Sequence, residues 1–229
     1  MKKLSILLIV LLCNSCIKER LLYLPEIQNA KVTEITDVSH AYLFYDETEK
    51  DSVDLNRKNL IGTTNWLINV DKRLTLKQTI PHIIYLQNKK RNAKMHKNED
   101  AKTYFTCNDT SIQNLGFIEF TDIFYHERPL RDVLNYKEHD EVLSITLNMV
   151  TPENYALNAT STAVNHSEIY NSFDDMISQI EEFYRSEESL MLYLLFDSQL
   201  SFQDYITLKS KLEIGLNPEI PVSNDEFIY

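Results

Sequence analysis

The alternation of apolar and polar residues predicts short strands along most of the chain. The clearest case is Val142–Asn148, where Leu143, Ile145 and Leu147 would line one face of a strand and polar residues the other. Leu190–Phe196 is instead continuously apolar, which is typical of a central strand covered on both faces. Further strands are expected at Ala41–Tyr45, Trp66–Val70, Thr103–Cys107, Leu115–Phe120 and Glu226–Tyr229.

A helical spacing appears in the last third of the chain. Apolar residues recur there at three- and four-residue intervals, which predicts a helix from Phe173 to Arg185 with one stripe facing the core. Ser172 is placed to cap its first turn, with Asp175 at the capping-box position. A second helix is expected from Phe202 to Leu212. The last third therefore reads strand, helix, strand, helix, strand, and parallel strands need such crossover helices.

One pattern occurs twice, in Val70–Ile80 and in Phe196–Ile206. Each copy has an apolar strand end, Asp, two polar residues, Leu, a hydroxyl residue, a large apolar residue and, four positions further, Ile. The hydroxyl residues fit as helix N-caps, each followed three residues later by a side chain that completes a capping box. These pairs are Thr75 with Gln78 and Ser201 with Asp204.

The recurrence indicates two copies of one supersecondary unit. We therefore expect an α/β (α+β) protein made of two tandem small mixed-sheet units with βαβαβ-like order. The expected boundaries are a signal peptide over residues 1–15, a lipidated tether over 16–30, a first unit over 31–128 and a second unit over 129–229.

The repeated strand, Asp-containing turn and capped helix resemble the periplasmic domain of the ExbD/TolR family, the smaller stator subunits of proton-driven TonB and Tol systems. The resemblance covers Ser167–Tyr229 and, more loosely, Trp66–Phe120. It implies a compact βαβαβ domain and partners in the cell envelope. The family also carries a membrane-spanning helix with a proton-conducting aspartate, and this chain shows neither, so the motor role is not carried over.

Pro81 is a second departure from the repeat, because it would fall in the second turn of a helix that begins after Thr75. Two starts for this helix therefore stay open. It begins after Thr75 and tolerates the proline, or it begins at Pro81 itself.

The first residues have the form of a bacterial lipoprotein signal. Lys2 and Lys3 precede the apolar run Leu4–Leu12, which is much shorter than the roughly 20 residues that span a bilayer. Ser15 then stands in the small-residue position before Cys16, as in a lipobox. We expect cleavage between Ser15 and Cys16, lipidation of Cys16 and labelling by palmitate. The alternative is an ordinary secretory signal that leaves Cys16 as a free thiol.

Composition argues against several classes of function. The formal charge of −11 opposes binding to nucleic acid, whose affinity rests on phosphate neutralisation. Only three glycines are present, too few for a Gly-rich phosphate loop. The histidines are scattered without a zinc-binding spacing, and no Gly-x-Ser-x-Gly elbow occurs. We therefore expect neither an enzyme nor a bound metal or cofactor, and we interpret Cys107 as a buried, inert thiol.

Few side chains are candidates for contact with a partner. Asp71 and Asp197, at the two strand ends, could bind a partner or peptidoglycan, although turn formation alone explains both. A basic run could face lipid headgroups or an acidic partner, or form a solvated helix end. It comprises Lys89, Lys90, Arg91, Lys94 and Lys97. The charged stretch 137–141 is interpreted as a solvated loop, and Asp51-Ser52-Val53 resembles an O-glycosylation site of Bacteroidota at Ser52.

Together these features predict a cell-envelope lipoprotein, anchored in the inner or outer membrane, with its folded part in the periplasm or on the surface. The expected function is a non-enzymatic protein-binding or accessory module of a TonB/Tol-like system. A surface lipoprotein that binds glycan or nutrient is the alternative.

Overall fold

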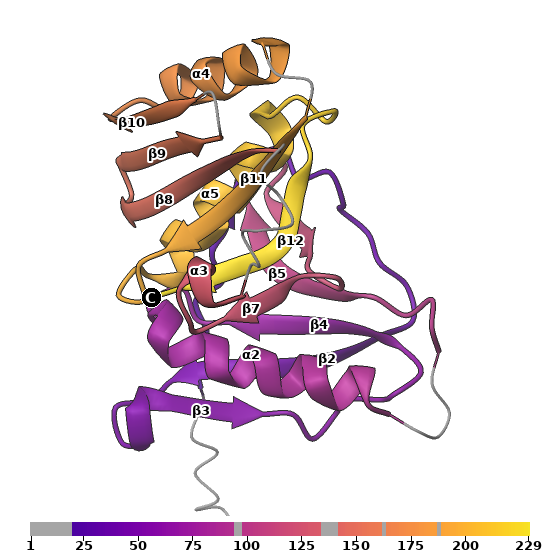
Figure 1. The fold of residues 1–229 in the computed structure, drawn as a ribbon. Coiled ribbons are helices and arrows are strands. Elements are labelled where there is room, and N and C mark those ends of the chain that lie inside the picture. The colour runs from indigo at the N-terminus through magenta and orange to yellow at the C-terminus, as the bar shows by residue number, and fades with distance from the viewer. Residues whose placement is uncertain (1–19, 94–97, 134–141, 162–163, 187–188) are drawn as a thin grey trace, which may run out of the picture.

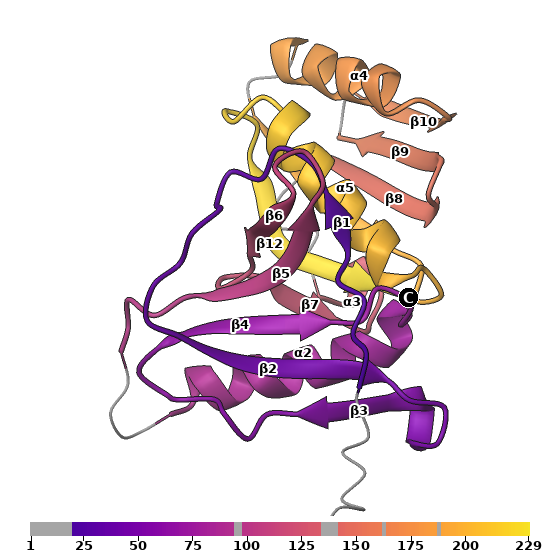
Figure 2. The same ribbon diagram turned by 180° about the vertical axis from the view of Figure 1, so that it is seen from behind.

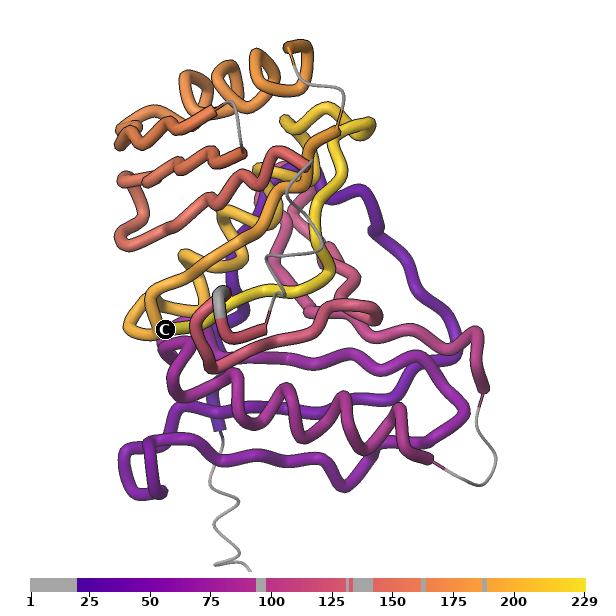
Figure 3. The backbone as a smooth tube through the Cα atoms, viewed as in Figure 1, coloured from indigo at the N-terminus to yellow at the C-terminus, as the bar shows by residue number. Residues whose placement is uncertain are grey.

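The computed structural model describes residues 20–93, 98–133, 142–161, 164–186 and 189–229. These residues form a mixed α/β fold with two six-stranded mixed sheets and three long helices, one sheet in each half of the chain (Figure 1). The expected fold class of two tandem α/β units is confirmed. The tube in Figure 3 shows the first half of the chain in the lower part of the molecule and the second half above it.

The first sheet contains six strands. Five follow the order β1-β5-β4-β2-β3, and the sixth, β6, pairs with β5 outside this order. They are β1 (Glu26–Ile27), β2 (Val38–Tyr45), β3 (Val53–Asn56), β4 (Asn65–Val70), β5 (Thr103–Asp109) and β6 (Asn114–Glu119). β2, β4 and β5 are parallel, whereas β3 and β6 pair antiparallel with β2 and β5. A single 3-10 turn, η1 (Lys50–Ser52), joins β2 to β3.

Helix α2 (Leu76–Arg91) connects β4 to β5 and lies across one face of this sheet, in front of it in Figure 1 and behind it in Figure 2. The Gln78 amide donates to Thr75 Oγ1 at 3.3 Å, and the Thr75 amide donates to Gln78 Oε1 at 2.8 Å. The predicted capping box is therefore present. Pro81 lies inside the helix, so the start after Thr75 is the right one of the two considered.

The second sheet has the order β10-β9-β8-β11-β12-β7. Its strands are β7 (Phe124–His126), β8 (Leu143–Thr151), β9 (Asn154–Thr160), β10 (Asn165–Tyr170), β11 (Leu190–Phe196) and β12 (Val222–Ile228). Three helices accompany it, α3 (Leu130–Val133), α4 (Phe173–Ser186) and α5 (Phe202–Gly215). β11 pairs with both β8 and β12, and α3 packs on the face of β11 that points away from the main core. The interpretation of Leu190–Phe196 as a central strand is confirmed.

The two units share one topology. In each, a leading strand (β1 or β7) pairs in parallel with the strand that follows the crossover helix (β5 or β12), and the first unit adds β6 after that strand. An antiparallel hairpin (β2–β3 or β8–β9) follows, and then a strand–helix–strand crossover through α2 or α5. The second unit inserts β10 and α4 between hairpin and crossover. The repeated sequence pattern therefore marks a repeated fold.

Helix α5 is the element that joins the units. The Phe105 ring on β5 meets the rings of Phe202 and Tyr205 on α5 edge-on, with centroids 5.1 and 6.2 Å apart. On its other side Tyr205 meets Phe196 of β11 at 5.0 Å. Figures 1 and 2 accordingly show α5 between the two sheets. One continuous apolar core therefore runs through both halves of the chain.

The unit boundaries differ from the expected ones. The segment expected as a tether, residues 16–30, is partly built into the fold. It contains β1, whose backbone pairs with β5, and its Arg20 forms an ion pair with Asp54 on β3. β7 was expected in the first unit, but it pairs with β12. β9 and β10 were not predicted. They lie between β8 and α4, so the helix does not directly follow β8 as the expected order of strand and helix had it. β10 was not recognisable because all of its side chains are exposed or half-exposed.

Candidate functional site

The loops that carry the predicted candidates Asp71 and Asp197 lie side by side and exchange four backbone hydrogen bonds. The bonds run from the amides of Leu76, Lys77, Phe202 and Gln203 to the carbonyls of Leu200, Ser198, Leu74 and Lys72, at 2.9, 2.8, 2.6 and 3.2 Å. The equivalent residues Thr75 and Ser201 face each other in an isolated antiparallel bridge. When each residue is exchanged for its equivalent in the other repeat, the Leu76–Leu200 bond becomes the Phe202–Leu74 bond. The Lys77–Ser198 bond likewise becomes the Gln203–Lys72 bond. The contact between the repeats therefore has two-fold pseudo-symmetry.

Both aspartates close the turn after their strand. Asp71 is fully buried, accepts from the Arg73 backbone amide at 3.1 Å and forms two 2.8 Å bonds with the Arg73 guanidinium. Asp197 is half-exposed and accepts from the Gln199 amide at 2.7 Å. Because Asp71 is enclosed, a partner could reach only the residues around it.

Arg73 is an accessible residue next to the buried Asp71. Its guanidinium carbon lies 4.7 Å from the ring centroids of both Tyr23 and Tyr45, and 45% of its side chain is exposed. The hydrogen bonds to Asp71 raise the pKa of Arg73. Tyrosine and arginine are the residue types that recur at protein interfaces. The loops therefore present a small surface with interface-like composition.

The basic run divides into residues with different roles. Lys90 Nζ donates to the Lys102 carbonyl at 2.6 Å and lies 5.2 Å from the Trp66 ring centroid. Arg91 donates to two backbone carbonyls at 3.0 and 2.8 Å and stacks on Phe124. Lys89 is exposed. Two of these three cations thus serve the fold, and Lys94 and Lys97 lie outside the described residues, as do Ser15 and Cys16.

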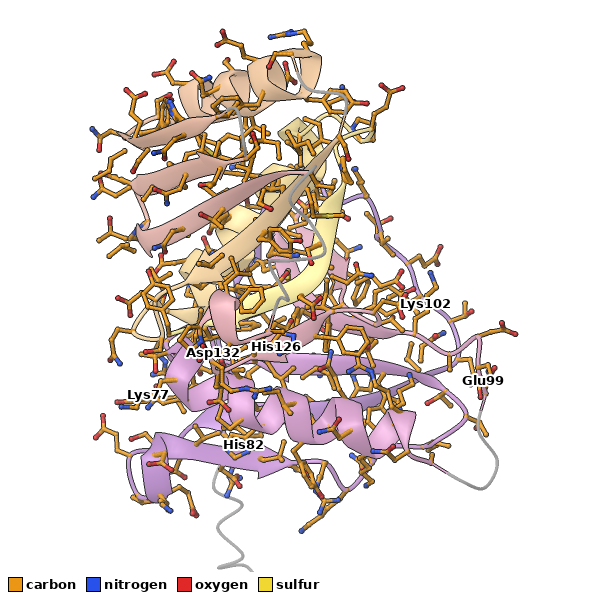
Figure 4. All side chains as sticks on the ribbon, in the orientation of Figure 1. Lys77, His82, Glu99, Lys102, His126 and Asp132 are labelled. Carbon is orange, nitrogen blue, oxygen red and sulfur yellow. The ribbon has the colours of Figure 1, made fainter. Side chains whose placement is uncertain are left out.

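The remaining candidates do not assemble into a reactive centre. Cys107 is buried, and desolvation raises the pKa of its thiol. His82 and His126 lie on different elements, α2 and β7 (Figure 4). Within the described ranges no three His, Cys, Asp or Glu side chains are arranged to hold a metal ion. In the same ranges no helix is sufficiently long and apolar to cross a bilayer. Ser52 is half-exposed in the turn before β3.

A groove lies at the junction of the two units and has a volume of about 660 Å³. One wall is the chain around β1, from Glu26 to Asn29, together with Thr110 after β5. The floor and the opposite wall come from α5 and from the start of α4. Ligand pockets typically measure roughly 300–1,000 Å³, so the size suits a ligand.

The groove combines an apolar strip with polar groups. Ile27, Phe173 and Ile214 form the strip, and Ile214 is 49% exposed. Lys211 lies 5.5 Å from the centroid of the Phe173 ring and forms no ion pair with any described residue. Ser210 also lines the groove and is only 6% exposed. Lys211 can therefore bind an anionic group that the described part of the fold does not supply.

Comparison with known proteins finds no family model that matches the sequence, no significantly similar curated protein and no solved structure with a significant match. The proposal for function therefore rests on the geometry of this chain and on the sequence features described above.

Sequence reasoning did not find the groove residues. Ser210 and Lys211 lie on α5, where a serine and a lysine are typical of any solvated helix face. Glu26 to Asn29 belonged to the expected tether. The available signal was that the helix from Phe202 carries apolar residues on more than one side, which indicates a helix with two packing neighbours.

Proposed function

We propose that this chain is an envelope lipoprotein, held to a membrane by lipid on Cys16, whose two fused units bind another envelope protein. The groove between β1, α4 and α5 is the proposed binding site. The proposed partner belongs to a TonB- or Tol-like apparatus, since the repeated unit resembles the periplasmic domain of ExbD/TolR. The role is non-enzymatic.

The observation that carries this proposal is an exposed apolar side chain beside a lysine that forms no ion pair with any described residue. Ile214 is left 49% exposed in the groove, and Lys211 lines the same groove. Covering apolar surface is favourable by roughly 25 cal/mol per Å². A bound partner would cover Ile214 and could place an anionic group against Lys211.

The position of the groove also favours a protein ligand. Glu26, at one end of the groove, forms a 2.5 Å ion pair with Lys72 of the paired loops. The groove therefore lies beside the loop that carries Arg73. A partner segment in the groove could also contact this interface-type side chain.

Photo-crosslinking in the living envelope tests the proposal. A photo-reactive amino acid replaces Ile214 in the groove or, as the matched control, Ile169 on β10, which is 66% exposed. We expect one defined adduct from position 214, identified by mass spectrometry as a stator or transporter component, and none from position 169.

Lys211→Glu should abolish the adduct, because it reverses the free charge of the groove. An adduct with an envelope protein outside these systems would contradict the assignment to a TonB/Tol-like apparatus. Identical adducts from both positions, or none from position 214, would contradict partner binding in the groove.

The glycan-binding alternative is supported by the outer face of the second sheet. Uncharged hydrogen-bonding side chains lie on adjacent strands there, and Asn158 links Thr146 of β8 to Ser167 of β10 at 3.4 and 2.7 Å. A glycan array tests this alternative, and Asn158→Ala should remove any signal that depends on the face. An array signal that survives the substitution would place glycan binding elsewhere.

A further inference from the structure

The free edge of β1 forms one wall of the groove. The side-chain amide of Gln203 on α5 already occupies the first position along that edge. Its Nε2 donates to the Glu26 carbonyl at 2.9 Å, and its Oε1 accepts from the Glu26 amide at 2.8 Å. A neighbouring β-strand would make the same two hydrogen bonds. Gln203 therefore imitates one residue of an added strand.

The next outward-facing position on this edge is free. In an extended chain, backbone groups alternate between the two sides, so Ile27 bonds towards β5, and its carbonyl indeed accepts from the Thr110 amide at 3.0 Å. The outward groups of the next residue belong to Gln28, which lines the groove. Across the described residues, no hydrogen bond to the Gln28 amide or carbonyl is found.

We infer that the groove binds an extended peptide segment of the partner, which continues the edge where Gln203 stops and hydrogen-bonds to the backbone of Gln28. This inference rests on the proposed function, because it names how the same groove holds its partner. Main-chain bonds to a strand edge provide affinity in such complexes, and side-chain pockets provide specificity.

The walls of the groove define which peptide fits. An apolar side chain of the peptide would cover Phe173 and Ile214, and an acidic one would meet Lys211. The ligand class is therefore a short extended peptide with an apolar residue and a nearby carboxylate.

Heptapeptides selected from a phage-displayed random library against the full chain provide the probe. Gln28→Pro removes the backbone N–H, whereas Gln28→Ala keeps it and serves as the matched control. We expect about tenfold weaker binding for Gln28→Pro, the loss of about one hydrogen bond, and a change of less than about twofold for Gln28→Ala. Lys211→Glu should weaken binding of acidic peptides, while Lys77→Glu, at an exposed site outside the groove (Figure 4), should not.

N-methylation of each peptide amide in turn gives a second readout that leaves the protein unchanged. Loss of binding at alternate positions is expected of an added strand. Selection of no peptide, binding that is equal for Gln28→Pro and Gln28→Ala, or tolerance of N-methylation at every position would overturn the inference. A crosslink from position 214 without these signatures would retain the proposed function and remove only the peptide mode.

Discussion

Thr75 and Ser201 are partners in an antiparallel bridge, and each caps the helix of its own repeat. Equivalent residues of two copies thus meet near a two-fold pseudo-axis. Such reciprocal contacts are the usual geometry of a symmetric dimer interface. Here the same geometry occurs within a single chain.

Loss of a cap should weaken this junction. In Ser201→Ala the Asp204 amide loses the hydroxyl that it reaches at 3.2 Å, which should lower the free energy of unfolding by about 1 kcal/mol. Urea unfolding measures the change. Ser178→Ala in α4, whose hydroxyl bonds only within its own helix, is the control and should change stability by less than about 0.5 kcal/mol. Equal effects of the two substitutions would argue against a capping role.

The packing of the N-terminal segment can be tested at a glycine. A methyl group added at Gly116 would lie 2.6 Å from Ala30 Cβ and 2.9 Å from Ile27 Cδ1. Gly116→Ala should therefore destabilise the fold by about 1–3 kcal/mol, as overpacking does. Gly62 has open space around it, and Gly62→Ala should be nearly neutral in the same unfolding assay. A neutral Gly116→Ala would show that residues 27–30 do not pack on β6.

Lys90 should make stability depend on pH. Burial lowers the pKa of its ammonium group from 10.5 to about 8. Between these values the unfolded chain holds a proton that the folded chain has released, so stability rises with pH across this window. Lys90→Met should flatten the rise, whereas Lys89→Met, at an exposed site, should retain it.

Unfolding midpoints from pH 7 to about 9 measure this slope before most of the tyrosines of the unfolded chain ionise. The upper limit matters because burial raises the pKa values of Tyr125 and Tyr205, whose ionisation on unfolding lowers stability at higher pH. An unchanged slope in Lys90→Met would mean that the amine titrates normally.

A buried ion pair should matter far more than an exposed one. Lys209 Nζ lies 2.5 Å from Glu226 Oε1, and the Glu226 side chain is fully buried, with Tyr205 donating to its other oxygen at 2.9 Å. Lys209→Met leaves a buried carboxylate without its cation and should cost about 3–5 kcal/mol. Lys72→Met, which breaks the exposed pair with Glu26, should cost at most about 1 kcal/mol. Similar losses in the two variants would contradict this distinction.

The proposed lipid anchor is tested separately from the fold. In a bacterial host, palmitate should label the chain, and Cys16→Ala should abolish the label. Cys107→Ala is the matched cysteine control and should leave labelling unchanged, because that thiol is buried in the core. Labelling that persists in Cys16→Ala would rule out lipidation at this residue.

The sequence was most informative where local chemistry determines structure. The capped starts of α2 and α5 and the apolar run of β11 were predicted because a cap or a buried strand is written in consecutive residues. The groove was not predictable in this way. Its walls come from Gln28, Asp174 and Lys211, which are far apart in sequence and are brought together only because α5 packs between two sheets. β1 was missed because two residues cannot form a recognisable pattern.

The contact of Phe105 with Phe202 has a consequence for biosynthesis. The nascent chain emerges with its amino terminus first, so β5 is made long before the helix that covers it. Phe120 of the same repeat covers one face of the Phe105 ring, but the side that α5 covers stays exposed until residues 202–229 have appeared. The first repeat therefore cannot complete its core before the end of the chain is made. If the chain is exported, as proposed, in the unfolded state, its core would be completed only after translocation. A chaperone would then have to shield Phe105 until translocation is complete.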